Sequence, residues 1–139
     1  MIDDSPGDVR LTREAFRESS VDVELHVAED GVSGMRFLRR EGVDADAPRP
    51  DLILLDLNLP KKDGREVLAE IKNDPDLMVI PTVILSTSDS EADITRSYQL
   101  HANCYLGKPL EFEQYAQIIK QINDFWLQKA TLTRNGARP

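Results

Sequence analysis

The fold of this chain is limited most by an aliphatic run, residues 52–55, which ends directly in the carboxylate of Asp56. A run without alternation between polar and apolar residues is typical of a strand buried on both faces, as in a parallel sheet. The residues that follow at 60–64 read PKKDG and favour a turn that leaves the sheet at once. Asp56 is therefore expected at the carboxyl end of a buried strand, where open α/β sheets bind their ligands.

Short apolar runs alternate with helical patterns along the rest of the chain. This rhythm predicts βαβ units around a parallel sheet, and so a doubly wound α/β fold with five strand and helix pairs. The expected strands after the first cover residues 23–30, 51–56, 80–86 and 102–108. The expected helices cover residues 5–19, 31–40, 65–74, 90–100 and a last segment from about residue 111 onward. The first helix begins with Ser5 as N-cap, and Asp8 is expected to complete a capping box.

The first strand is nearly absent from the chain. Only Met1 and Ile2 precede Asp3 and Asp4, if these acids follow their strand as Asp56 follows its own. The first strand is central in a doubly wound sheet, and losing it forfeits several buried aliphatic side chains at about 1.5 to 3 kcal/mol each. We expect the natural protein to have residues upstream of Met1, and the upstream reading frame tests this.

Length and composition predict one soluble domain over residues 1–139, with the tail from about residue 128 as an extension. No apolar run approaches the roughly 20 residues that span a bilayer, and no export signal is evident, so we expect a cytoplasmic protein without a membrane partner. The net charge of -8 argues against a nucleic-acid partner. Cys104 is the single cysteine, which excludes an intramolecular disulfide and a cysteine-based metal site.

Polar groups follow the ends of four expected strands. They are Asp3 and Asp4, Asp56, Ser86 and Lys108. Parallel topology brings these ends to one edge, where three carboxylates repel one another unless a cation intervenes. Mg²⁺ suits such an oxygen-rich site. A carboxylate beside Mg²⁺ and a lysine can act as a nucleophile and form an aspartyl phosphate, because phosphoryl transfer depends mostly on positioning and charge neutralisation.

The motifs DD, LLDLNLPKKDG, VILSTS and CYLGKPL, in this order, resemble the receiver domain of bacterial two-component response regulators over nearly the whole chain. Asp56 precedes Ser86 by 86 − 56 = 30 residues and Lys108 by 108 − 56 = 52 residues, as that family requires. The resemblance implies a flavodoxin-like strand order, 2-1-3-4-5. It also implies that Asp56 accepts a phosphoryl group from a sensor histidine kinase.

The resemblance further implies the roles of the residues around Asp56. The implied Mg²⁺ ligands are Asp4 and Asp56 directly, Asp3 through water, and the backbone carbonyl of Asn58. Lys108 would hold the phosphoryl oxygens, and Ser86 would bond to the phosphoryl group and draw its loop inward. Tyr105 would then turn from an exposed to a buried position as the aromatic switch, although ordinary core packing of Tyr105 is an alternative. A cis peptide bond before Pro109 is also implied.

Thr87 departs from the family pattern, because many relatives carry a smaller residue there. A larger side chain narrows the access of water to the phosphoryl group, so we expect slow self-dephosphorylation. The connection EGVDADAPRP and the long last helix resemble small stand-alone receivers that pair with bacterial phytochromes, which implies a bacteriophytochrome kinase as partner.

The last helix carries an apolar stripe that is expected to face the core. The stripe contains Phe112, Tyr115, Ile119, Ile122 and Trp126. Ile118 and Phe125 widen its apolar arc, which suggests a partner surface, with ordinary core burial as an equal alternative. A homodimer built on the fourth helix, the fifth strand and the fifth helix is the form that we expect.

Three functions compete for this constellation. The leading hypothesis is a single-domain phosphoacceptor that is not an enzyme and whose output is protein binding. An aspartyl-nucleophile phosphatase needs an acid two residues after the nucleophile, where Asn58 cannot transfer a proton as a carboxyl group does. A phosphorylation-independent interaction module on the same fold is the third hypothesis, and the presence of the acids, the hydroxyl and the lysine argues against it.

Overall fold

The computed structural model describes residues 1–133 and contains, within that range, a parallel sheet of three strands. The strands are β1 (Ile53–Leu55), β2 (Thr82–Ser86) and β3 (Cys104–Gly107), in the order β1-β2-β3. Their register pairs Leu54 with Val83 and Ile84 with Tyr105. The predicted third, fourth and fifth strands are therefore present, although each is shorter than expected.

Two further chain segments extend this sheet beside β1. Ile2 forms parallel bridges with Leu55 on one side and Ala28 on the other. The backbone N–H of Ile2 donates to Leu54, 2.8 Å, and that of Asp3 donates to Ala28, 3.0 Å. The spatial order is therefore the predicted 2-1-3-4-5, and the flavodoxin-like fold is confirmed.

The segment 23–30 is not the regular strand that the sequence predicted. Within this segment, which the structure describes fully, Ala28 forms the single bridge. The physical reason is the short neighbour, because only residues 1–3 lie beside this segment to exchange backbone hydrogen bonds with it. A cavity of about 760 Å³ lies next to Met1 at the amino ends of the strands, lined in part by Leu25, Leu52 and Trp126.

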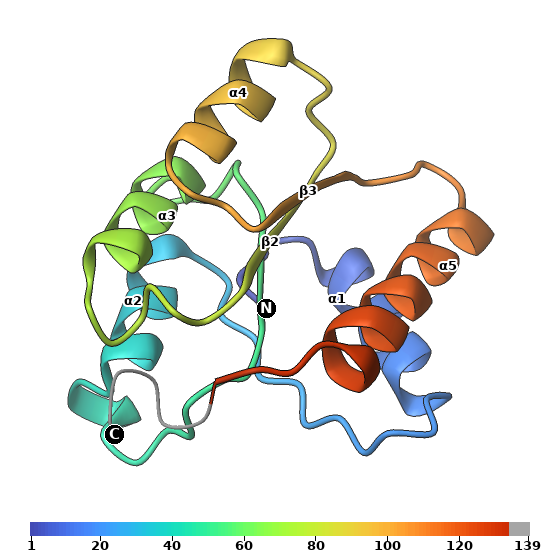
Figure 1. Ribbon diagram of the computed structural model, residues 1–139, viewed down its shortest axis with the longest axis horizontal. Helices are drawn as coiled ribbons and strands as arrows, with labels where there is room; N and C mark the ends of the chain where they lie inside the picture. Colours follow the sequence, from blue (N-terminus) through green and yellow to red (C-terminus); the bar gives the residue numbers. More distant parts are fainter. Residues whose placement is uncertain (134–139) are drawn as a thin grey trace.

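Helices cover both faces of the sheet (Figure 1). On one face lie α1 (Pro6–Arg17) and α5 (Phe112–Ile122), and on the other lie α2 (Gly31–Arg39), α3 (Gly64–Asn73) and α4 (Glu91–Gln99). A 3₁₀ turn, η1 (Gly42–Asp44), follows α2, and a π-helical segment, η2 (Asn123–Lys129), continues α5. The predicted tail from about residue 128 lies in part outside the described residues. No helix within residues 1–133 is long and apolar enough to cross a membrane.

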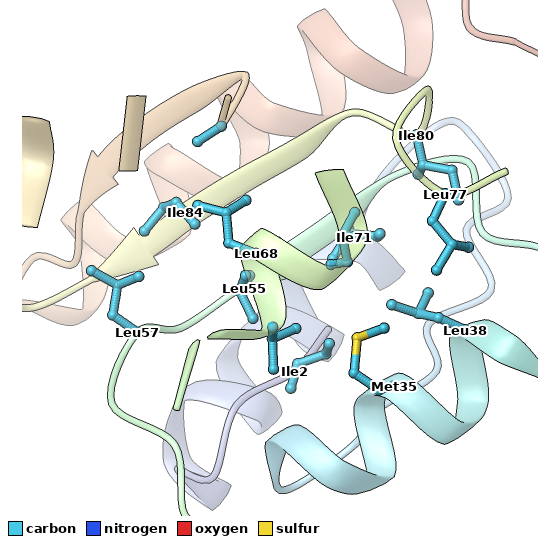
Figure 2. Close-up of a cluster of buried hydrophobic side chains, with 13 residues drawn as sticks. Ile2, Met35, Leu38, Leu55, Leu57, Leu68, Ile71, Leu77, Ile80 and Ile84 are labelled. Atoms are coloured by element: carbon cyan, nitrogen blue, oxygen red, sulfur yellow. The ribbon is translucent and has the colours of Figure 1, made fainter. Parts of the chain in front are cut away.

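The central strands bury side chains on both faces, as their aliphatic sequences predicted. Leu55 and Ile84 belong to the core beneath α2 and α3, which also includes Ile2 (Figure 2). Leu54 and Val83 point to the opposite core, beneath α1 and α5. This double burial fixes the strand ends, and so the polar residues that follow them, in a rigid frame.

The predicted stripe of the last helix is only partly buried. Tyr115, Ile119 and Ile122 lie in the core, whereas Phe112 is 69% exposed at the first residue of α5. The prediction for Phe112 was wrong because a helical repeat does not show where the helix leaves the body of the protein. Phe125 is also exposed.

The start of α1 differs from the predicted capping box. The Oγ of Ser5 accepts a hydrogen bond from the N–H of Asp8, 3.3 Å, as expected for an N-cap. The reciprocal bond of a capping box, from the N–H of Ser5 to the side chain of Asp8, is not formed. The N–H of Ser5 donates instead to the Oδ1 of Asp3, 2.9 Å. The carboxylate of Asp8 is thereby free to point towards Lys108.

Candidate functional site

Three acids gather at the carboxyl edge of the sheet. Asp3, Asp4 and Asp56 each offer one carboxylate oxygen, and these oxygens lie within 4.8 Å of one another. Asp3 and Asp56 are buried, and Asp4 is exposed. The sequence predicted this meeting from the strand ends alone, and the structure brings all three together.

Lys108 reaches into this cluster from the residue that follows β3. Its Nζ lies 2.8 Å from the Oδ2 of Asp3, 2.8 Å from the Oδ2 of Asp8 and 3.1 Å from the Oδ2 of Asp56. Its side chain is 4% exposed. Lys108 therefore brings a buried positive charge to the acids, at the place that the sequence predicted.

Asp8 is a site residue that the sequence analysis did not assign to the site. It was interpreted only as half of a helix cap, because its position in the first turn of a helix is common for an acid. The available signal was its place in the first turn of the helix that directly follows Asp3 and Asp4, because that turn starts at the same edge of the sheet. A fourth carboxylate thus shares the ammonium of Lys108.

Burial and ion pairing shift the pKa values of the side chains in this cluster in opposite directions. Burial raises the pKa of Asp3, although hydrogen bonds from Lys108 and the Ser5 backbone oppose the rise. Burial alone would lower the pKa of Lys108, but its bonds to Asp3 and Asp8 and the nearby charges raise it instead. Lys108 therefore stays charged at neutral pH, and the crowded acids retain an excess of negative charge that suits a divalent cation.

Ser86 ends β2 in a buried position. Its Oγ accepts a hydrogen bond from the N–H of Ser88, 3.2 Å, and its carbonyl accepts one from the N–H of Lys108, 2.7 Å. The bond from Lys108 joins the ends of β2 and β3 beside the acidic cluster. Thr87 is exposed between them.

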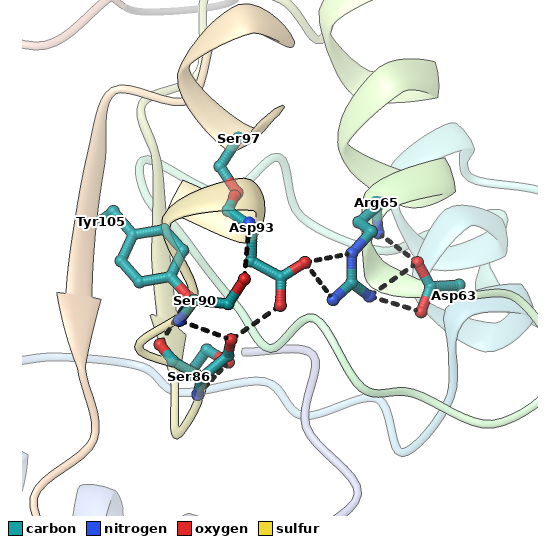
Figure 3. Close-up of polar contacts among 8 residues, drawn as sticks. Asp63, Arg65, Ser86, Ser90, Asp93, Ser97 and Tyr105 are labelled. Atoms are coloured by element: carbon teal, nitrogen blue, oxygen red, sulfur yellow. Dashed lines mark hydrogen bonds and ion pairs between the residues drawn. The ribbon is translucent and has the colours of Figure 1, made fainter. Parts of the chain in front are cut away.

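Tyr105 lies on β3 in a half-buried position and packs against the core beneath α2 and α3. Its hydroxyl donates to the carbonyl of Ser88, 2.8 Å, and its backbone N–H donates to the hydroxyl of Tyr98, 3.1 Å. Figure 3 shows the ring of Tyr105 turned towards the segment that follows Ser86. Tyr105 and Ser86 are thus linked through Ser88, and the switch role of Tyr105 remains a prediction.

A charged network lies on the far side of Ser88 (Figure 3). Arg65 at the start of α3 bonds to Asp63 through Nη1, 3.0 Å, and to Asp93 of α4 through Nη2, 2.7 Å. The Oγ of Ser88 donates to the other oxygen of Asp93, 2.7 Å. No motif in the sequence indicated this network, because no spacing along the chain relates α3 to α4.

Two predictions from the resemblance have different outcomes. Asn58 is exposed two residues beyond Asp56, and its carbonyl as a metal ligand stays a prediction. The expected cis peptide before Pro109 was wrong, because the structure has no cis bond within the described residues. A trans bond is the lower-energy form of an X-Pro peptide, and Lys108 reaches the acids with it.

The fold and the site define a receiver domain of the response regulator family. The family model of the response regulator receiver domain matches residues 1–120, and the chain belongs to this family. The resemblance drawn from the motifs is confirmed.

Individual relatives narrow this class. Response regulator Rcp1 from Synechocystis sp. is 50% identical over 132 residues, which are 95% of this chain and 90% of that protein. The crystal structure of its Mn²⁺-bound form has a TM-score of 0.93 and covers 96% of both chains. The phosphorylated cyanobacterial phytochrome response regulator RcpA is 56% identical, with a TM-score of 0.94 over 96% of this chain and 95% of that one. The bacteriophytochrome response regulator AtBRR is 38% identical, with a TM-score of 0.72 over 96% and 94%.

Proposed function

We propose that this response regulator accepts a phosphoryl group on Asp56 in a Mg²⁺-dependent reaction and thereby switches a protein-binding surface. The contact between Lys108 and Asp56, 3.1 Å, beside two further acids carries this proposal. A carboxylate becomes a phosphoryl acceptor when neighbouring cations neutralise the charge that develops on the transferred group. The phosphorylated structure of RcpA, at 56% identity, supports the same chemistry here.

The residues around Asp56 have different roles in this proposal. Asp4 and Asp56 would bind Mg²⁺ directly, Asp3 would contribute through water, and Asn58 would offer its backbone carbonyl. The ion would supply positive charge to the phosphoryl oxygens. Lys108 holds a phosphoryl oxygen from the opposite side, and Ser86 donates its hydroxyl to another, which leaves Tyr105 to follow the segment that Ser86 draws inward.

The donor that we propose is a sensor histidine kinase of the bacteriophytochrome type, in the cytoplasm. The names of RcpA and AtBRR, both phytochrome response regulators, support this choice.

In this proposal, residues 1–139 form one receiver domain with an extension from about residue 128. Its activity is that of a phosphoacceptor with slow self-dephosphorylation and no enzymatic turnover, and its partners are proteins.

A homodimer through α4, β3 and α5 is also part of the proposal. Apolar side chains are exposed on α4, on α5 and on η2, which continues α5, with Tyr98 at 48%, Phe112 at 69% and Phe125 at 54%. Light scattering with and without the phosphoryl analogue beryllofluoride tests it, and a Phe125→Glu variant should lower the dimer fraction. A monomer at every concentration would rule out this surface as a dimer interface.

One labelling experiment tests the central proposal. The protein is incubated with Mg²⁺ and a small-molecule phosphodonor, and the intact mass is measured. We expect one base-labile phosphoryl group that is absent in Asp56→Asn and absent when the divalent ion is removed with a chelator. Asp22→Asn, a change to an exposed acid in the connection after α1, serves as the matched control.

The other outcomes point to the competing functions. A protein that takes up no label but still binds its partner would be a phosphorylation-independent interaction module. Rapid turnover of many phosphodonor molecules per chain would indicate a phosphatase. Label that persists in Asp56→Asn would place the acceptor elsewhere and overturn the assignment of Asp56.

A further inference from the structure

The segment Ser86 to Ser88 connects the site to the rest of the molecule through four hydrogen bonds of Ser88. Its N–H donates to the Oγ of Ser86, 3.2 Å, and its carbonyl accepts from the hydroxyl of Tyr105, 2.8 Å. Its own Oγ donates to Asp93, 2.7 Å, and accepts a hydrogen bond from the N–H of Ser90, 3.3 Å. A displacement of Ser88 therefore alters the surroundings of Ser86 and Tyr105 together.

The position of Asp93 is in turn fixed by Arg65. The Nε and Nη2 atoms of Arg65 both contact the Oδ1 of Asp93, at 3.0 and 2.7 Å. The remaining guanidinium nitrogen, Nη1, contacts both oxygens of Asp63, at 3.0 and 3.2 Å. The hydrogen bond from Ser88, followed by that from Arg65, lowers the pKa of Asp93, so this carboxylate is charged at neutral pH.

Arg65 belongs to the element that directly follows the turn after Asp56. Asp63 caps α3 by accepting a hydrogen bond from the backbone N–H of Arg65, 2.9 Å. Ser90 caps α4 by accepting one from the N–H of Asp93, 3.3 Å. The ion pair between Arg65 and Asp93 thus joins the starts of two helices (Figure 3). The loops that precede these helices follow Asp56 and Ser86.

We propose that Arg65 and Asp93 are positioning residues that hold Ser88, and through it the hydroxyl of Ser86 and the ring of Tyr105, in the arrangement that receives the phosphoryl group. A fork that bonds to two carboxylates in fixed directions suits this role better than a point charge does. The effect on phosphoryl transfer rests on the proposed function, whereas the effect on the segment itself does not.

Amide hydrogen exchange of the unphosphorylated protein tests the first half of the proposal. Arg65→Met should speed exchange in a peptide that covers residues 86–93 by about fivefold, because the loss of about 1 kcal/mol of coupling changes an equilibrium by that factor. Ser88→Ala, which removes the bond to Asp93 and the weaker bond from the N–H of Ser90, should act in the same direction. Arg65→Lys should restore part of the protection.

Arg39→Met is the matched control. It removes another half-exposed ion pair, the single contact between Nη1 of Arg39 and Oε1 of Glu70 at 3.2 Å, on the α2 side of α3. This variant should leave exchange in residues 86–93 at the wild-type rate. Equal exchange in wild type and Arg65→Met would overturn the proposal, and so would equal acceleration by Arg39→Met.

The rate of labelling by a small-molecule phosphodonor tests the second half. The rate should fall about fivefold in Arg65→Met and Ser88→Ala and stay unchanged in Arg39→Met. Faster exchange with an unchanged labelling rate would overturn the role in positioning Ser86. Failure of the wild type itself to take up label would instead count against the phosphoacceptor function, and the exchange measurements would still decide whether Arg65 and Asp93 hold the segment.

Discussion

Asp8 competes with Asp56 for the ammonium of Lys108, and the distances favour Asp8. Its Oδ2 lies 2.8 Å from Nζ, compared with 3.1 Å for Asp56. An ammonium held by Asp8 and Asp3 leaves Asp56 more available to a cation and to a phosphoryl donor. Asp8 therefore adjusts the balance of charge within the site while it lies outside the group of acids proposed as metal ligands.

The Asp8→Asn variant should bind a divalent cation more weakly. Without the charge of Asp8, the ammonium of Lys108 bonds more strongly to Asp56 and repels the ion, and we expect the dissociation constant to rise about fivefold, or about 1 kcal/mol. Mn²⁺ binding followed by electron paramagnetic resonance measures this. Asp22→Asn should bind as the wild type does, and unchanged or tighter binding by Asp8→Asn would contradict the prediction.

Thr87→Ala should lose its phosphoryl group faster than the parent. Thr87 is exposed directly after Ser86, and a methyl side chain there opens a path for the attacking water. After the phosphodonor is removed, we expect the label to decay a few fold faster than in the parent. This change corresponds to an activation barrier lowered by about 1 kcal/mol. The Thr87→Ser variant keeps the hydroxyl but has a smaller side chain than threonine. A decay rate between those of the parent and Thr87→Ala would show that the size of this side chain controls the loss of the phosphoryl group.

The sequence predicted that Asp3, Asp56 and Lys108 would lie together because each one follows the end of an expected strand, whereas their roles as metal or phosphoryl ligands stay predictions. Strand ends in a parallel sheet are forced together, so the order of the motifs was enough to bring Asp3, Asp56 and Lys108 to one edge. Asp8 and Arg65 were missed because their partners are set by side-chain direction across elements. Such contacts depend on three-dimensional packing and leave no periodic signal in the chain.

At the level of elements, the approach of α3 to the end of β1 is unusually close. The N–H of Gly64 donates to the carbonyl of Leu57, 2.8 Å. A β-carbon on Gly64 would lie 2.6 Å from the Cα of Leu57 and closer still to the carbonyl oxygen of Asp56. The turn after Asp56 can fold back in this way only with a glycine at this position.

Gly64→Ala should therefore destabilise the fold by about 3 kcal/mol, because the added methyl group meets backbone atoms that cannot move aside. Urea denaturation followed by circular dichroism measures the free energy of unfolding. Gly7→Ala in the first turn of α1 is the control, since its added carbon meets only the Oγ of Ser5 at 4.0 Å. A loss below 1 kcal/mol in Gly64→Ala would show that the turn can adjust.

Some elements can be predicted from their own sequence, whereas the structure of others depends on a neighbouring segment of the chain. The strands around residues 53–55 and 82–86 are aliphatic and buried on both faces, so their sequences were sufficient to predict them as strands. The segment 23–30 has apolar residues but becomes a strand only where a neighbour supplies hydrogen bonds, and just residues 1–3 do so. Phe112 followed the helical repeat and is nevertheless exposed, because burial depends on where the sheet ends.

Across the whole molecule, α1 and α5 are joined by a buried polar contact. The hydroxyl of Tyr115 lies 2.9 Å from the Oγ1 of Thr12 and also donates to the carbonyl of Asp8, 3.4 Å. Burial raises the pKa of Tyr115 to about 12, although its bond to Thr12 opposes the rise. The contact connects the turn that carries Asp8 to the helix of the proposed dimer surface.

Stability should decline in alkaline solution partly because of Tyr115. The unfolded chain releases the phenolic proton near its ordinary pKa of about 10, whereas the folded chain keeps it to about 12, so the free energy of unfolding falls as pH rises through this window. Tyr115 should account for roughly 1 to 2 kcal/mol of that fall. The denaturant midpoints at pH 9 and pH 12 should differ less in Tyr115→Phe than in the wild type. The exposed control Tyr98→Phe should follow the wild type, and a parallel decline in all three would contradict the prediction.

The two bridges of Ile2 have a thermodynamic consequence. Asp3 and Asp4 follow a residue that is hydrogen-bonded on both sides, so these acids come together with Asp56 only when the sheet is intact. A cation that binds this group binds the native chain and not the unfolded one, and by mass action it shifts the folding equilibrium. A melting temperature recorded across a series of Mg²⁺ concentrations therefore becomes a binding isotherm for the site, obtained without a label, a phosphodonor or a partner protein.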